Sequence, residues 1–214
     1  IEKDELVNRL EQLNEAVRTW DSDAVALVTF DDGWGDVLLV EDEFDRLSNL
    51  QPVLFIGQNH FTTPVRTLPM QRLYQYSADT GLVIDDLRTE LKTMSEEAAH
   101  VKLDEMGVDR MLEPEWLLTI NEIEKLSTKG WVIASHGHSH ENLRQADNLE
   151  EAFSVLTESI EQRVYTPWLA WPEGRWSYET VESAKKGGFT RQFGLLDEPH
   201  DGPPTGMVMR KIWS

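Results

Sequence analysis

The stretch from Ala24 to Trp34 constrains the fold of this chain more than any other part of the sequence. An apolar, β-branched run, Ala24 to Phe30, leads directly into Asp31, Asp32 and Gly33. This pattern predicts a buried strand that ends in a glycine-containing loop. Two adjacent carboxylates at the mouth of a buried strand repel each other and are costly to desolvate. A metal ion bound by one carboxylate is the simplest way to stabilise the pair, and it leaves the other free to move protons.

A second strand-like run, much later in the chain, also ends in polar side chains. Residues Trp131 to Ser135 are mostly apolar, and they lead into His136-Gly137-His138-Ser139-His140. Imidazole and carboxylate groups are the usual ligands of catalytic zinc. The two strand ends together therefore indicate a metal site.

Strand-like and helix-like segments alternate along most of the sequence. The helices are predicted at 4–20, 36–50, 87–94, 96–106, 120–128, 148–164 and 178–186, and the strands at 24–30, 53–57, 131–134, 168–171, 189–195 and 207–213. A helix between two strands makes the strands parallel, so the pattern predicts an α/β protein, either a barrel or an open parallel sheet. His60 and His100 have no neighbouring carboxylate at ligand spacing, and we expect both to be surface or structural residues.

Composition excludes several classes of function. The chain has 214 residues with 39 Asp and Glu against 20 Lys and Arg, a formal charge of -19. Nucleic acids and anionic membranes need a positive surface, so neither is an expected partner. Without cysteine, thiol catalysis and disulfides are excluded. No apolar run could span a bilayer and no signal-peptide pattern is present. Because the chain begins at Ile1, we expect a trimmed N-terminus, which leaves an extracytoplasmic or a cytoplasmic location open.

Three motifs carry a resemblance to a known family. They are Thr29-Phe30-Asp31-Asp32-Gly33, then Ser135-His136-Gly137-His138-Ser139-His140-Glu141-Asn142-Leu143, and finally Leu169-Ala170-Trp171-Pro172-Glu173-Gly174. In this order they resemble the motifs of polysaccharide deacetylases with NodB homology, also called carbohydrate esterase family 4. The resemblance extends from Val25 to Phe189.

This resemblance implies a fold and a position for the site. It implies a single domain over 1–214, a distorted (β/α) barrel of about seven parallel strands, with 58–114 as a mostly helical family insertion. In parallel barrels the site lies at the carboxyl ends of the strands.

The resemblance also implies roles for individual residues. Asp32, His136 and His140 would bind one divalent metal ion, with zinc as the first choice and cobalt, nickel, iron or manganese as alternatives. A pairing through His136 and His138 stays open. Asp31 would be the general base, and the backbone N–H of Glu173, after Pro172, would donate to the oxyanion.

The sequence departs from the family pattern at two functional positions. Many members have an arginine two residues before the proline, which orients the base, and here this residue is Ala170. Arg175 is a possible substitute, and Arg210, in a tail that resembles the last strand of the exopolysaccharide-acting branch, is another candidate for the site. The usual late histidine that acts as general acid has only His200 as a counterpart.

Aromatic residues beside the motifs are candidates for sugar stacking. Trp34 and Trp171, together with Pro172 and Arg175, are the expected substrate-binding residues, although each tryptophan could equally pack around the barrel mouth. Trp176 is a further aromatic near the third motif.

The expected activity is metal-dependent hydrolysis of N-acetyl groups, or alternatively O-acetyl groups, on an amino-sugar polysaccharide or surface glycan. Two other functions stay open. One is hydrolysis of small cyclic amides or imides on the same scaffold, which a closed apolar pocket would favour. The other is a metal- and carbohydrate-binding protein that has lost turnover, which Ala170 would explain. The sequence sets no oligomeric state.

Overall fold

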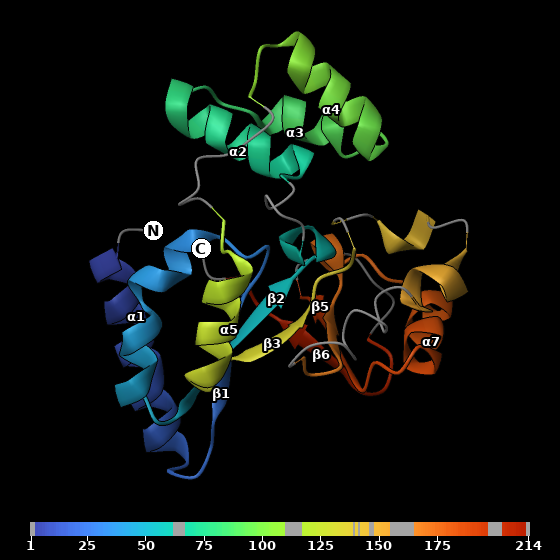
Figure 1. Cartoon of the computed structure of the whole chain (residues 1–214). Coiled ribbons are helices and arrows are strands. Elements are labelled where there is room, and N and C mark those ends of the chain that lie inside the picture. Colours follow the sequence, from blue (N-terminus) through green and yellow to red (C-terminus); the bar gives the residue numbers. More distant parts are fainter. Residues whose placement is uncertain are drawn as a thin grey trace.

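One curled parallel sheet organises the fold of this protein, seen here in a computed structural model that describes residues 3–61, 67–109, 117–138, 140, 142–145, 148–154, 165–196 and 203–212. The strands are β1 (Ala26–Phe30), β2 (Leu50–Ile56), β3 (Val132–Ser135), β4 (Trp168–Ala170), β5 (Arg191–Leu195) and β6 (Met207–Arg210). They lie in chain order and every neighbouring pair is parallel, so the sheet forms a half-barrel (Figure 1). The predicted α/β fold with a distorted barrel is therefore confirmed.

The predicted count of about seven strands was wrong for the described part of the chain, where the sheet has six. The sequence pattern itself contains only six apolar runs of strand length, and the seventh strand came from the family resemblance alone. Within the described residues β6 has no hydrogen-bonded neighbour beyond β5, so the half-barrel is open between β6 and β1.

Alternating side chains along the strands form two sides of the core. On β2, Val53 and Phe55 face the inside of the half-barrel, and Leu54 and Ile56 pack on the outside. Side chains of a strand point to opposite faces in turn, so a fully buried strand must be apolar on both. The inner cluster also contains Ala134, Ala170 and Phe193 from the next strands.

Helices cover the outside of the sheet on two sides (Figure 1). Helices α1 (Lys3–Trp20) and α5 (Ile120–Thr128) lie beside β1 to β3, and α7 (Tyr178–Lys186) lies on the side of β4 and β5. Thr119 and Ser177 cap α5 and α7 by accepting backbone N–H donors in the first turn. The predicted bounds of both capped helices are confirmed.

A separate layer of three helices lies over the half-barrel (Figure 1). Helices α2 (Pro69–Thr80), α3 (Asp85–Leu91) and α4 (Glu96–Glu105) share a small apolar core of their own, which includes Leu73, Leu91 and Leu103. The completely buried guanidinium of Arg72 links α2 to α4, because it pairs with Asp104 at 2.7 Å. It also donates to the backbone carbonyls that follow α4. Residues 67–109 are called the helical layer below.

The structure differs from the sequence prediction in two helical segments. The segment predicted as one α-helix at 36–50 forms two 3₁₀ segments, η1 (Gly35–Leu39) and η2 (Glu41–Arg46), and its end belongs to β2. Both segments have i to i+3 hydrogen bonds, and their buried side chains are Val37, Val40, Phe44 and Leu47. The apolar spacing therefore identified the buried face but not the helix type. Helix α2 was not predicted, although Pro69 at its start and Gly81 in the left-handed conformation at its end are typical helix signals.

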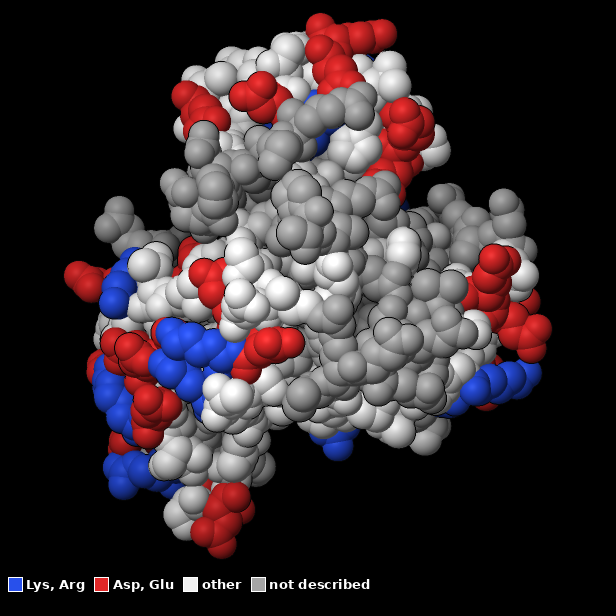
Figure 2. All heavy atoms as spheres, viewed as in Figure 1, with Lys and Arg blue, Asp and Glu red and all other residues white. Residues whose placement is uncertain are grey.

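The remaining elements are short. They are η3 (Gln58–Phe61), η5 (Leu143–Gln145) and η6 (Pro172–Gly174). Of the helix predicted at 148–164, residues 149–154 are helical and 155–164 lie outside the described residues. Acidic side chains predominate over the helical layer in the face shown in Figure 2, in keeping with the negative net charge. No helix in the described ranges has the length and apolar character needed to cross a membrane.

Candidate metal and catalytic site

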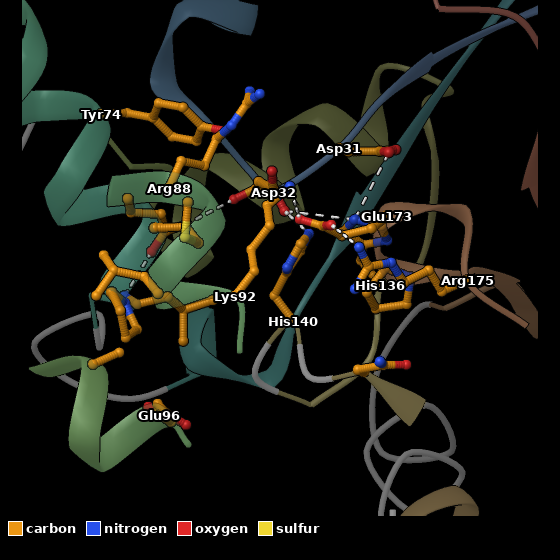
Figure 3. Close-up of a pocket in the computed structure, with 18 of the residues that line it drawn as sticks. Asp31, Asp32, Tyr74, Arg88, Lys92, Glu96, His136, His140, Glu173 and Arg175 are labelled. Atoms are coloured by element: carbon orange, nitrogen blue, oxygen red, sulfur yellow. Dashed lines mark hydrogen bonds and ion pairs between the residues drawn. The ribbon is translucent and has the colours of Figure 1, made fainter. Parts of the chain in front are cut away.

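The structure brings Asp32, His136 and His140 together at the carboxyl ends of β1 and β3 (Figure 3). One ligand atom of each residue lies within 4.8 Å of the others. Both histidine Nε2 atoms are 3.5 Å from the same carboxylate oxygen, Oδ1 of Asp32. Two ligands of a tetrahedral zinc at about 2.0–2.1 Å from the ion are about 3.4 Å apart, so these spacings fit a shared ion.

The surroundings of His136 also fit a metal ligand. Its Nδ1 donates to the Ala170 carbonyl at 3.0 Å, which leaves the Nε2 lone pair facing Asp32. Such an outer hydrogen bond fixes the tautomer and the ring orientation of a ligating histidine. Burial lowers the pKa of His136, so the ring is neutral at neutral pH, as a ligand must be.

Strained backbone marks this site. In the described part of the chain, three non-glycine residues have a positive φ, namely Asp32 (66°), His140 (56°) and Glu173 (56°). Left-handed φ values in such residues cost free energy and persist only where the surroundings enforce them. All three residues belong to the predicted site. No sequence pattern indicated that their backbone would be strained.

His60 and Gln71 hold the backbone of Asp32. The His60 ring lies between two carbonyl oxygens, with Nδ1 2.9 Å from Leu118 O and Nε2 2.9 Å from Asp32 O. Gln71 of α2 donates to the same Asp32 carbonyl at 3.3 Å. The His60 ring packs so closely on Gly33 that a Cβ there would lie 2.5 Å from it. His60 is therefore structural, in agreement with one of the two roles expected for it.

Asp31 is held by Arg210 from the opposite edge of the sheet. The Arg210 Nη1 is 2.6 Å from Asp31 Oδ1 and 3.3 Å from Thr29 Oγ1, and the guanidinium lies over the Phe55 ring. Withdrawal from water raises the pKa of Asp31, but nearby positive charge, from His136 when protonated and from Arg210, lowers the pKa below its usual value. At neutral pH, where burial favours neutral His136, Arg210 is a cation in direct contact with Asp31.

The turn after β4 presents the backbone amide that the resemblance assigns to the oxyanion. Gly174 donates to the Trp171 carbonyl at 2.8 Å and Arg175 donates to the Pro172 carbonyl at 3.1 Å. The Glu173 amide takes part in neither of these two hydrogen bonds. The Glu173 side chain forms ion pairs with Lys92 at 2.6 Å and with Arg175 at 3.7 Å.

A cavity of about 710 Å³ lies between the strand ends and the helical layer. Asp31, Asp32, His136 and His140 form part of its wall, together with Pro172 and Glu173. The helical layer contributes the opposite wall, which contains Tyr74, Arg88, Lys92, Met94, Ser95 and Glu96 (Figure 3). Apolar side chains such as Leu68, Met70 and Leu91 share the wall with the charged groups, so the cavity is not the wholly apolar pocket that a cyclic-amide hydrolase would favour.

The expected substrate-binding residues divide into two groups. Trp34, Pro172 and Arg175 line the cavity, and the Trp34 ring is in edge contact with Tyr74 at 6.2 Å. The prediction that Trp171 stacks on a sugar is wrong, because its side chain is completely buried and packs edge to face on Phe153. Trp176 is also buried and belongs to the same cluster beside α7.

The remaining candidates differ in what the structure shows of them. The cluster of metal-ligand atoms contains His140 and not His138, which favours the pairing four residues apart. His200 lies outside the described residues, so its role as the acid stays a prediction.

Sequence reasoning missed Gln71 and Lys92 as site residues because neither lies next to a motif. Their approach depends on how the helical layer packs over the strand ends. His60 offered a signal, since it follows β2 closely, as Asp31 follows β1.

Comparisons with known proteins found structural relatives only. No protein-family model matches the sequence, and no curated protein matches it. Among solved structures, IcaB from Ammonifex degensii is 16% identical with a TM-score of 0.56, covering 100% of this chain and 84% of that one. A de-N-acetylase from Aggregatibacter actinomycetemcomitans is 16% identical with a TM-score of 0.54, covering 94% and 83%.

A third relative was solved with a small carboxylate. The deacetylase PplD from Streptococcus pyogenes, in complex with acetate, is 15% identical with a TM-score of 0.50 and matches 86% of this chain. This chain spans 62% of the length of that protein. With its parallel half-barrel and these structural matches, the chain has the fold of the bacterial polysaccharide deacetylases.

Proposed function

We propose that this protein is a metal-dependent carbohydrate deacetylase that hydrolyses N-acetyl groups on an amino-sugar polysaccharide or surface glycan, with O-acetyl groups as the alternative. The observation that carries this proposal is the convergence of Asp32, His136 and His140 beside a separate carboxylate, Asp31. The structural relative from Aggregatibacter is a de-N-acetylase, and this supports the type of reaction.

The proposed reaction assigns one task to each group. A divalent ion held by Asp32, His136 and His140 would supply a Lewis acid for the acetyl carbonyl. Asp31 accepts a proton from the water that attacks the carbonyl carbon, and the Glu173 amide donates to the oxyanion. The C–N bond then breaks to give acetate and a free amine, with His200 proposed as the proton donor to nitrogen.

Arg210 takes the role of the arginine that many family members have at the position of Ala170. Its guanidinium orients Asp31 and keeps the carboxylate ionised, which a general base requires. The departure at Ala170 therefore no longer favours a protein without turnover, since the charge is supplied from β6 rather than from β4.

The Asp31→Asn variant tests the proposal. It keeps the shape of the side chain but removes the base, so acetate release from N-acetylated amino-sugar oligomers should fall by about 10²–10⁴-fold with metal content unchanged. Metal content by mass spectrometry and acetate by an enzymatic assay give the two readings. Full activity of the variant would contradict the assignment of Asp31, and a wild-type protein that binds metal and glycan without releasing acetate would contradict the proposed reaction.

A further inference from the structure

Glu173 occupies a conformation that its residue type disfavours. Its φ is 56° and its ψ is 17°, between Pro172 and Gly174 in a short 3₁₀ turn. A side chain with a Cβ adopts this left-handed region only when its surroundings enforce it. The orientation of the Glu173 amide therefore depends on the contacts of this residue.

Lys92 provides the shortest of those contacts. Its Nζ lies 2.6 Å from Glu173 Oε1, and Arg175 approaches the other carboxylate oxygen at 3.7 Å. Lys92 and Glu173 are far apart in sequence, and Figure 3 shows the Lys92 side chain reaching from the helical layer toward the strand ends.

The Lys92 backbone is firmly placed. Lys92 is the C-cap of α3 and donates to the Arg88 carbonyl at 3.1 Å, and its neighbour Leu91 is buried in the apolar core of the helical layer. The two side chains of the ion pair are 27% and 20% exposed, so the pair is better shielded than an ion pair on the open surface. Such a pair can hold a backbone turn in place.

The helical layer also contacts a second strained residue, Asp32. Gln71 of α2 donates to the carbonyl of Asp32, whose φ is 66°. Two elements of the layer thus contact two of the three strained residues of the site.

We propose that Lys92 is a positioning residue that keeps the Glu173 amide directed at the oxyanion by holding the Glu173 carboxylate. This inference rests on the proposed function, because it concerns the amide that stabilises the transition state there. It gives one residue of the helical layer, Lys92, a role in positioning the catalytic amide. Donors of this kind act only when they are preorganised at the position where charge develops.

The first test uses Lys92→Met in the full chain. We expect kcat for acetate release from N-acetylated amino-sugar oligomers to fall about 10- to 100-fold, with KM, metal content and Tm unchanged. Lys92→Arg keeps a cation beside the carboxylate and should restore part of the loss. The matched control is Lys102→Met, which removes an ion pair with Glu90 from the same layer and should leave kcat unchanged.

The second test uses Glu173→Gly, because glycine adopts a positive φ without needing to be held. In that background Lys92→Met should cause no further loss of kcat. In the protein with Glu173 present, Lys92→Met should also shift the amide resonance of Glu173 in a ¹H–¹⁵N spectrum, and Lys102→Met should not.

Each other outcome overturns the inference. Wild-type kcat in Lys92→Met shows that the amide is placed without Lys92, and a rise in KM alone shows that Lys92 contacts substrate instead. A loss of equal size in the Glu173→Gly background shows that Lys92 acts by another route. Failure of the proposed function is distinct, since it appears as absent acetate release in the wild-type protein.

Discussion

Arg210, on the last strand of the sheet, lies 2.6 Å from Asp31 at the end of the first strand. The half-barrel is open, because β6 and β1 share no strand pairing in the described residues, and these two residues connect its edges. The Arg210 side chain is only 8% exposed, so its charge is poorly screened by water. One ion pair therefore joins the edges of the sheet and orients the proposed base.

Replacing Arg210 should affect turnover more than substrate binding. We expect Arg210→Met to lower kcat about 10- to 100-fold, because the base loses its orientation and its neighbouring charge. Steady-state kinetics separates kcat from KM, and metal content should stay at the wild-type level. Lys211→Met removes an exposed cation one residue away and is the control. Unchanged kcat in Arg210→Met would show that Asp31 needs no such partner.

The histidine loop offers a direct comparison of two side chains. His140→Ala should lower metal affinity by more than about 100-fold, since even the loss of an outer partner of a ligand costs about 10–100-fold. His138→Ala should bind metal as the wild type does, because the ligand cluster contains His140. Competition with a chelating dye measures both affinities. The reverse result would establish the alternative pairing through His136 and His138.

Gly33 should tolerate no side chain. Gly33→Ala places a Cβ 2.5 Å from the His60 ring at a φ of +65°, so both overpacking and backbone strain act together. We expect the free energy of unfolding to fall by about 2–5 kcal/mol. Gly107→Ala has a similar φ of +75° but open space around the new Cβ, and it should cost about 1–2 kcal/mol. Urea denaturation measures both, and equal losses would show that His60 yields to the new group.

The two tryptophans should give opposite phenotypes. Trp34→Ala removes an aromatic face from the cavity wall and should raise KM about 2- to 12-fold with little change in stability. Trp171→Ala empties a fully buried site and should lower the free energy of unfolding by about 3–5 kcal/mol. Kinetics and urea denaturation of both variants test this division. An unchanged KM in Trp34→Ala would show that glycans do not stack on this ring.

Local sequence patterns predicted the elements that carry the site. Apolar alternation and runs located the strands, and capping residues such as Thr119 and Ser177 located helix bounds, because these signals act over a few neighbouring residues. The same reasoning failed at η1 and η2, where buried spacing suits either helix type, and at Trp171, since a tryptophan beside a motif can face a cavity or the core.

The sequence by itself determined that two polar strand ends would lie on a parallel sheet, with Asp31 and Asp32 on one and the histidines on the other. Parallel strands carry their carboxyl ends to the same edge, so this follows from the order of elements alone. Only the tertiary structure decided which groups support them. Arg210, which the resemblance offered as a candidate for the site, reaches Asp31 across the sheet opening, and Lys92 and Gln71 reach the site from the helical layer. Such long-range contacts depend on packing that no local pattern contains.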